Sequence, residues 1–124
     1  MADVQSKLSI DQKAAAVRAS YEAAARGDLR QAADGLADDA VFHSALRKQE
    51  FRGREAILAE QLKQQAEFKA QYFLHDVLAS DEHVVALLRV TQEVDGKRET
   101  HQLVHVLHVD DEGKGKEVWS VFSS

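Results

Sequence analysis

Six histidines are the side chains best suited to acid–base chemistry in this chain of 124 residues, which contains no cysteine. The lack of cysteine excludes a disulfide scaffold, thiolate zinc sites and a cysteine nucleophile. His101 and His105 have a spacing that chelates a metal on a helix, but their segment has the composition of a strand. On a strand they lie about 13 Å apart, at roughly 3.3 Å per residue, which is too far to share one ion. We therefore expect no metal site and no cofactor.

The dipeptide Asp95-Gly96 predicts a two-residue hairpin turn of type I′ between strands over 83–94 and 97–109. The resulting cross-strand pairs are Val94 with Lys97, Val90 with His101, Leu88 with Leu103, and Ala86 with His105. Because side chains alternate along a strand, one face of this hairpin collects both histidines among apolar residues.

Two interpretations of His105 follow from this apolar setting. Burial in a concave apolar surface would tune its imidazole for acid–base work. Alternatively, His105 is a core histidine whose hydrogen bond to a backbone carbonyl satisfies it. A second inward histidine on the same strand and a serine on the facing strand keep the functional interpretation open.

Other candidate residues follow from the same alternation. An even-length turn before the last strand places Val118, Ser120 and Phe122 on the face of His105 and Trp119 on the opposite face. In the short strand over 40–46, only one of His43 and Ser44 can face a cavity.

These positions give a candidate site. Tyr21, on the first helix, either donates a hydrogen bond into the pocket or is a core aromatic with its hydroxyl at the rim. We predict that His105 is catalytic, with His101 or His43 assisting. The predicted substrate-binding residues are Tyr21, Phe42, Ser44, Leu103, Val118, Ser120 and Phe122.

The elements that position these residues form an α+β pattern, with helices first and a meander of antiparallel strands after them. Ser9 and Gln12 fit a capping box that begins the first helix, and Gly27 ends it. A second, shorter helix starts at Asp28 and is broken by Asp38-Asp39. The later elements are a strand over 40–46, a basic loop (Arg47, Lys48, Arg52 and Arg54) that pivots on Gly53, a helix over about 54–66, and strands over 72–79, 83–94, 97–109 and 116–122. We predict a flexible tail over 1–9 and a single domain over 10–124.

Both faces of the predicted sheet are mostly apolar, so both need cover. The helices can cover one face. A second copy of the chain is the simplest cover for the other, which predicts a homodimer through the outer sheet face.

Charge and hydropathy narrow the partners. The formal net charge of −5 argues against nucleic acid, which is bound by clustered Lys and Arg. The N-terminal residues lack the apolar region of a secretory signal, and no apolar run approaches the length of a membrane span. We expect a cytoplasmic protein that binds no nucleic acid and no membrane.

Several motifs together resemble the SnoaL-like branch of the nuclear transport factor 2-like superfamily, over about residues 10–122. The motifs are Val17-x-x-x-Tyr21, Gly27-Asp28-Leu29, the run from Leu36 to His43, the run from Arg52 to Ile57, and the ending from Glu117 to Phe122. The resemblance implies a cone-shaped α+β roll (cystatin-like), in which three N-terminal helices pack on a curved antiparallel sheet around an apolar pocket. It also implies homodimers that pair through the outer sheet face.

The superfamily contains ketosteroid isomerases, polyketide cyclases and dehydratases, but a fold does not transfer an activity. Aligned on these motifs, Ser44 falls where the isomerases have their general-base Asp, and Ser20 falls where they have their oxyanion-hole Tyr. His105 falls where their protonated Asp donates to the developing enolate. The resemblance therefore places His105 in the cavity without the isomerase residue set.

Two functions remain as hypotheses. The first is a cofactor-free acid–base enzyme of the isomerase, cyclase or dehydratase type that acts on a small apolar molecule containing a carbonyl group. The second is a noncatalytic module that binds a hydrophobic ligand or mediates dimerisation. The inward histidines favour the first, and the lack of an inward carboxylate on the last strand favours the second.

Overall fold

The computed structural model describes residues 7–45 and 48–123, so most of the predicted tail and Arg47 of the basic loop lie outside the described residues. The elements in chain order are α1 (Ile10–Ala25), α2 (Leu29–Ala33), β1 (Leu36–Ser44), β2 (Gln49–Arg52), α3 (Arg54–Phe68), β3 (Gln71–Ala79), β4 (His83–Val94), β5 (Lys97–Val109) and β6 (Gly115–Ser123). This is an α+β fold. Within the described ranges, no helix is long and apolar enough to cross a membrane.

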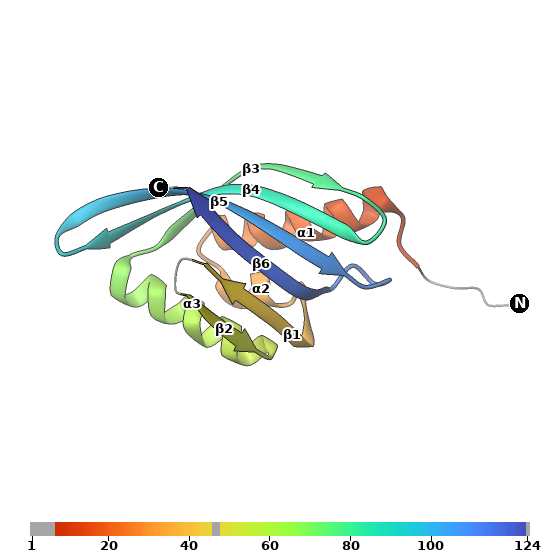
Figure 1. The fold of residues 1–124 in the computed structure, drawn as a ribbon, viewed down its shortest axis with the longest axis horizontal. Coiled ribbons are helices and arrows are strands. Elements are labelled where there is room, and N and C mark those ends of the chain that lie inside the picture. The colour runs from red at the N-terminus through yellow and green to blue at the C-terminus, as the bar shows by residue number, and fades with distance from the viewer. Residues whose placement is uncertain (1–6, 46–47, 124) are drawn as a thin grey trace, which may run out of the picture.

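The strands form one curved sheet in the order β2-β1-β6-β5-β4-β3 (Figure 1). Neighbouring strands run antiparallel except β1 and β6, which run parallel, so the prediction of a wholly antiparallel sheet was wrong at this pair. The parallel register sets Phe42 opposite Val118 and Ser44 opposite Ser120. This pairing places the short N-terminal strand directly beside the C-terminal one.

The first helix begins as predicted, and the second is shorter than predicted. Ser9 and Gln12 form the capping box of α1 through reciprocal hydrogen bonds of 3.1 and 2.8 Å. Helix α2 ends at Ala33, well before Asp38-Asp39. The carbonyl of Gly35 accepts a hydrogen bond of 2.8 Å from the amide of Gly115 on β6. Pairing with the sheet therefore ends this helix, and the two aspartates lie within β1.

Part of the predicted basic loop is a strand. Residues 49–52 form β2, which pairs with β1 at the edge of the sheet. Gly53 then adopts a φ of 93°, in the left-handed region that favours glycine, and α3 starts at the next residue. The helix ends at Phe68, slightly beyond the predicted end near Ala66.

The predicted hairpin is confirmed. Asp95 and Gly96 have φ values of 52° and 77°, as a type I′ turn requires. The observed pairs include Val94 with Lys97, Val90 with His101, Leu88 with Leu103 and Ala86 with His105. The next pairing sets His105 opposite Ser120 and Leu103 opposite Phe122, again as predicted.

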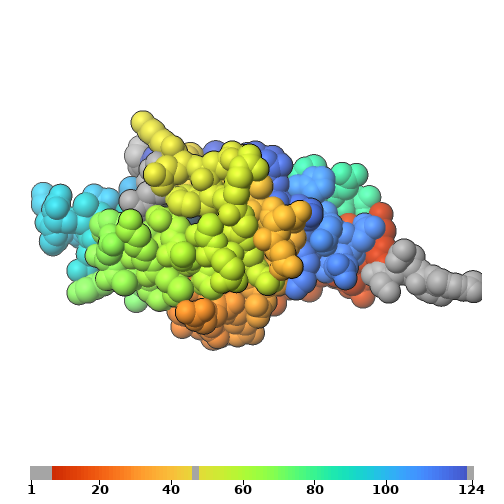
Figure 2. Space-filling model, turned by 90° about the horizontal axis from the view of Figure 1, so that it is seen from below, coloured from red at the N-terminus to blue at the C-terminus, as the bar shows by residue number. Residues whose placement is uncertain are grey.

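The three helices lie on one side of the sheet (Figure 1). Seen from below the view of Figure 1, α3 lies across much of the visible surface and the tip of the β4–β5 hairpin projects at one end (Figure 2). The buried core between the two layers is apolar and includes Val17, Leu29, Val84, Leu88, Leu107 and Val118. Burial of these side chains is the main contribution to the stability of the fold. Because the three helices pack on the concave face, no described element covers the outer face of the sheet.

Candidate functional site

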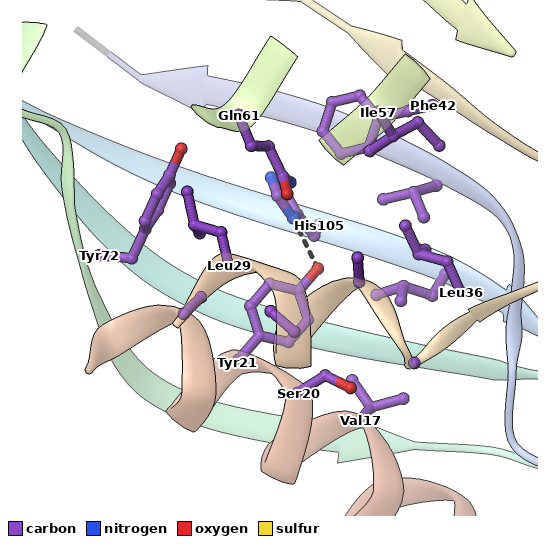
Figure 3. A pocket seen from close by; sticks show the side chains of 16 residues that line it. Val17, Ser20, Tyr21, Leu29, Leu36, Phe42, Ile57, Gln61, Tyr72 and His105 are labelled. Atoms are coloured by element: carbon purple, nitrogen blue, oxygen red, sulfur yellow. Dashed lines mark hydrogen bonds between the residues drawn. The ribbon is translucent and has the colours of Figure 1, made fainter. Parts of the chain in front are cut away.

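A pocket opens between the helices and the concave face of the sheet (Figure 3). We call its first part the apolar compartment, which holds about 630 Å³ of space and is partly open to solvent. Its characteristic wall residues are Val17, Ala33, Leu29, Leu36, Leu107 and Val118. A concave, largely apolar wall that also carries a few polar groups is typical of sites for small molecules.

We call the second part the polar compartment, which holds about 580 Å³ of partly open space. It shares five wall residues with the apolar compartment, namely Phe42, Ile57, Gln61, Tyr72 and His105. Its own polar wall residues are Ser44, Glu60, Gln64, Gln92 and Ser120. His105 therefore stands where an apolar space meets a polar one.

Tyr21 and His105 form a short hydrogen bond, of 2.6 Å between Oη and Nδ1 (Figure 3). Strand β5 directs the imidazole inward and leaves the residue only 5% exposed. Phe42 packs edge-on against the same ring at 5.4 Å between centroids. The aromatic contacts and the hydrogen bond together fix the orientation of the imidazole.

Burial keeps both members of this pair uncharged at neutral pH. It lowers the pKa of His105 to about 4, because the apolar surroundings disfavour the imidazolium. It raises the pKa of the Tyr21 hydroxyl above its usual value, with a smaller contribution from Tyr72. The pair therefore carries one hydroxyl hydrogen and one imidazole hydrogen.

Those two hydrogens can be arranged in two ways. When the hydroxyl of Tyr21 donates to Nδ1 of His105, Nε2 carries the imidazole hydrogen and can donate it to a ligand. When Nδ1 donates to the hydroxyl oxygen, Nε2 is an acceptor. Within the described chain no residue bonds Nε2. One atom of the pair is therefore available either to give or to take a proton.

The structure brings most of the predicted substrate-binding residues into this pocket. The six that line it are Tyr21, Phe42, Ser44, Leu103, Val118 and Ser120. Phe122 does not line either compartment, because it lies near the end of β6, where it is 39% exposed and packs against His101. The prediction that Phe122 lines the pocket was therefore wrong.

His101 shares the inner sheet face with His105, as predicted, but it does not line the pocket. Its Nε2 lies 3.3 Å from a carboxylate oxygen of Glu99, which is also on β5. Its Nδ1 is buried and finds no hydrogen-bond partner among residues 7–45 and 48–123. The expectation that His101 assists His105 is not supported by these positions.

His43 lies on the outer face of the sheet, because the register of β1 turns Phe42 and Ser44 inward. Its ring nitrogens face two carboxylates, at 3.3 Å for Glu50 and 2.5 Å for Glu117. The ring also stacks on Trp119. The prediction of His43 as an assisting residue in the cavity is thereby corrected, and Ser44 is the one that faces inward.

Among the polar or aromatic wall residues that the sequence analysis missed are Glu60, Gln61, Gln64, Tyr72 and Gln92. Two of them carried a signal. Gln61 follows Ile57 and Leu58 at helical spacing, so it shares their buried face of α3. Gln92 continues the inward alternation of Leu88 and Val90 along β4. A glutamine at a position where the periodicity of the helix or strand predicts a buried apolar residue would have identified Gln61 and Gln92.

No group of three His, Cys, Asp or Glu side chains that could hold a metal ion occurs in the part of the chain that the structure describes. The ionisable groups on the pocket wall are His105, Tyr21, Tyr72 and Glu60. The chemistry these residues offer is proton transfer and hydrogen bonding.

The sequence pattern of the SnoaL-like domain matches residues 17–118, which include Tyr21 and the second half of α1, helices α2 and α3, and the strand of His105. This chain belongs to the SnoaL-like family. A solved nuclear transport factor 2-like protein from Cytophaga hutchinsonii has the same fold. That protein is 16% identical, with 90% of this chain and 89% of that chain covered and a TM-score of 0.72.

Two further solved structures resemble this SnoaL-like chain. Bal32a, from a soil-derived mobile gene cassette, is 26% identical over 93% of this chain and 92% of its own, with a TM-score of 0.83. An epoxide hydrolase from M. tuberculosis is 19% identical over 92% of this chain and 84% of its own, with a TM-score of 0.77. No curated protein matches the sequence. The activity must therefore be argued from the pocket.

Proposed function

We propose that this SnoaL-like protein is a cofactor-free acid–base enzyme that acts on a small, largely apolar molecule containing a carbonyl group. The observation that carries the proposal is the 2.6 Å hydrogen bond between Tyr21 and His105 at the wall of a mostly apolar pocket. A buried, oriented and uncharged imidazole polarises a carbonyl without needing a cofactor. The reaction class is isomerisation, cyclisation or dehydration by way of an enolate.

In the proposed reaction, Nε2–H of His105 donates a hydrogen bond to the carbonyl oxygen of the substrate, while Tyr21 donates to Nδ1 and fixes that arrangement. Glu60 removes a proton from the carbon next to the carbonyl, and the electron pair moves onto the oxygen to give an enolate. The proton then returns from Glu60 to carbon. Glu60 is a half-buried carboxylate on α3 that accepts a 2.9 Å hydrogen bond from Gln64.

Exchange of deuterium from solvent tests this chemistry without knowledge of the natural substrate. We would incubate the protein with cyclohexanone and 4-tert-butylcyclohexanone in D2O and follow loss of the α-proton signals by NMR. The wild type should accelerate exchange over buffer. His105→Gln and Glu60→Gln should each lower the enzymatic rate at least ~100-fold, the usual contribution of a positioned acid or base.

His75→Gln provides the matched control, because His75 is an exposed histidine on β3 outside the pocket. Its exchange rate should equal that of the wild type. Equal rates for wild type and His105→Gln would contradict the assignment of His105.

Ligand binding without turnover is the second candidate function. It is favoured by the last strand, whose described residues contribute Val118 and Ser120 to the pocket wall and no carboxylate. The same ketones separate the two functions. Binding of the ketones in calorimetry with no exchange above the buffer rate would favour the binding module and reject the enzyme.

The proposal includes a homodimer that pairs through the outer sheet face. Two neighbouring rows of side chains cross this face, Leu78, Val85, Val106 and Trp119 in one and Leu87, Val104 and Val121 in the other. Leu78 is 56% and Val121 50% exposed, so a second copy would remove considerable apolar surface from water. Sedimentation at micromolar concentration should give a dimer for the wild type and a monomer for Val121→Glu. A monomeric wild type would contradict this part of the proposal.

A further inference from the structure

We infer that the ligand of this pocket is an uncharged amphipathic molecule whose apolar body fills the apolar compartment. Its neutral polar head, with both a hydrogen-bond donor and an acceptor, occupies the polar compartment. This inference rests on the proposed function and narrows its substrate class. It excludes molecules whose head is a carboxylate or a phosphate.

Gln92 is the first observation behind this assignment. Its side chain lies on the inner face of β4, belongs to the wall of the polar compartment and is only 6% exposed. No residue between 7 and 45 or between 48 and 123 makes a hydrogen bond to its amide. Because this side-chain amide has no partner within the described residues and lies on the wall of the pocket, it is available to bind a ligand or water there.

Ser120 and Gln61 repeat this pattern from two other elements. Ser120, on β6, is 5% exposed, and its side chain lacks a hydrogen-bond partner in the described chain. Gln61 extends from α3 into the same space, near the imidazole of His105 (Figure 3). Strands β4 and β6 and helix α3 thus each direct into one cavity a polar side chain that makes no hydrogen bond within the described chain. Nε2 of His105 faces the same cavity.

The chemistry of these groups indicates what they recognise. An amide offers two donor hydrogens and an acceptor oxygen, and a hydroxyl offers both functions. Gln61, Gln92, Ser120 and the neutral His105 are uncharged, and the one carboxylate among the described residues of this wall, Glu60, would repel an anionic head. Burying an isolated charge without a charged partner is far more costly than burying a neutral polar group. A carboxamide or hydroxyl head fits these groups, and an anionic head does not.

The other end of the pocket determines the rest of the ligand. The wall of the apolar compartment beyond His105 is built from Leu29, Leu36, Leu107 and Val118, and they present no polar side-chain atoms. An alicyclic or branched hydrocarbon body there would be stabilised by the removal of its apolar surface from water. If the carbonyl of the ligand lies beside His105, where the two compartments meet, its apolar body would extend into the apolar compartment and its polar head into the polar compartment.

Calorimetry with three probe molecules tests the inference. The probes are cyclohexanecarboxamide, cyclohexanecarboxylate at pH 8, and toluene as an apolar reference. We expect the carboxamide to bind at least tenfold more tightly than the carboxylate. Gln92→Met, which keeps the length of the side chain and removes its amide, should weaken carboxamide binding about tenfold and leave toluene binding within twofold.

Gln102→Met serves as the matched control, because Gln102 is exposed on the outer face of β5. It should bind all three probes as the wild type does. The inference is overturned if the carboxylate binds as well as the carboxamide, or if Gln92→Met binds the carboxamide normally.

Failure of this inference and failure of the proposed function can be told apart. The preference for a neutral head is measured by binding alone, so it should persist in Glu60→Gln, which is inactive in the proposed exchange reaction. Exchange without a head preference would retain the enzyme and reject the ligand class. A head preference without exchange would retain the ligand class and reject the enzyme.

Discussion

Histidine side chains on the concave and outer faces of the sheet have opposite surroundings. On the concave face, His105 is buried, surrounded by aromatic rings and bonded to a neutral tyrosine hydroxyl. On the outer face, His43 is half-buried between the carboxylates of Glu50 and Glu117. The first environment keeps an imidazole neutral and oriented. The second places a carboxylate beside each ring nitrogen. Residue type alone therefore does not identify the functional histidine, because strand parity determines its partners.

The largest expected difference between the two faces is in stability. His105→Ala removes a buried ring, leaves a cavity and deprives Tyr21 of its partner, so it should lower the free energy of unfolding by about 2–5 kcal/mol. His43→Ala should lower it by less than about 1 kcal/mol, since ion pairs this exposed contribute little. Urea unfolding of both variants measures this contrast. Similar losses would remove the distinction between the faces.

The next effect concerns pH. The pKa of His105 falls from an ordinary 6.5 to about 4 on folding, so between these values the unfolded state binds more protons than the folded state. Stability should therefore decrease as the pH falls from 6.5 to 4, and the shift corresponds to roughly 3 kcal/mol. Above pH 6.5 His105 contributes no pH dependence. Chemical unfolding at pH 7 and pH 4 should show a smaller loss for His105→Gln than for the wild type. Equal losses would indicate that His105 titrates normally.

A smaller effect is expected from the hydroxyl of Tyr21. Tyr21→Phe keeps the aromatic packing and removes the 2.6 Å hydrogen bond to His105. Nδ1 would then be a buried group without its partner, at a cost of about 1–3 kcal/mol. The enzymatic exchange rate should fall as well, because the orientation of the imidazole relaxes. The free energies of unfolding of Tyr21→Phe and of Tyr72→Phe, which changes another tyrosine of the pocket wall, are compared by denaturation. Wild-type stability and exchange in Tyr21→Phe would show that the bond has no role.

The smallest effect is expected on the outer face. Glu117→Gln removes one of the two carboxylates beside His43 and leaves the other. The free energy of unfolding should change by no more than about 0.5 kcal/mol, and less still at high salt, because the pair is partly exposed to solvent. Thermal unfolding at low and high salt tests this expectation. A loss of several kcal/mol would mean that this cluster is as important as the one around His105.

Local patterns account for the part of the fold that the sequence predicted. The Asp95-Gly96 turn set the register of β4 and β5 and hence the inward position of His105. The capping box at Ser9 likewise began α1 as expected. Both signals act between residues that are near one another in the chain, where a single turn or cap decides the outcome.

Long-range pairing accounts for most of the rest. The parallel contact of β1 with β6 joins segments far apart in the chain and has no local signature, yet it decided that Ser44 rather than His43 faces the pocket. The wall residues from α3 depended on how that helix packs across the sheet. Phe122 had the right parity but lies beyond the end of the pocket, because parity gives the face of a residue and not its depth.

The charge state of His105 is the central claim, and NMR of its imidazole nitrogens tests it most directly. In protein labelled with ¹⁵N, the Nδ1 and Nε2 shifts of His105 should be those of a neutral ring from pH 8 down to pH 5, with a midpoint at about 4. Tyr21→Phe should change the Nδ1 shift, since that nitrogen bonds the hydroxyl. A midpoint at or above 6.5 would contradict the account, because His105 would then be an ordinary solvated histidine and not a neutral group of the pocket.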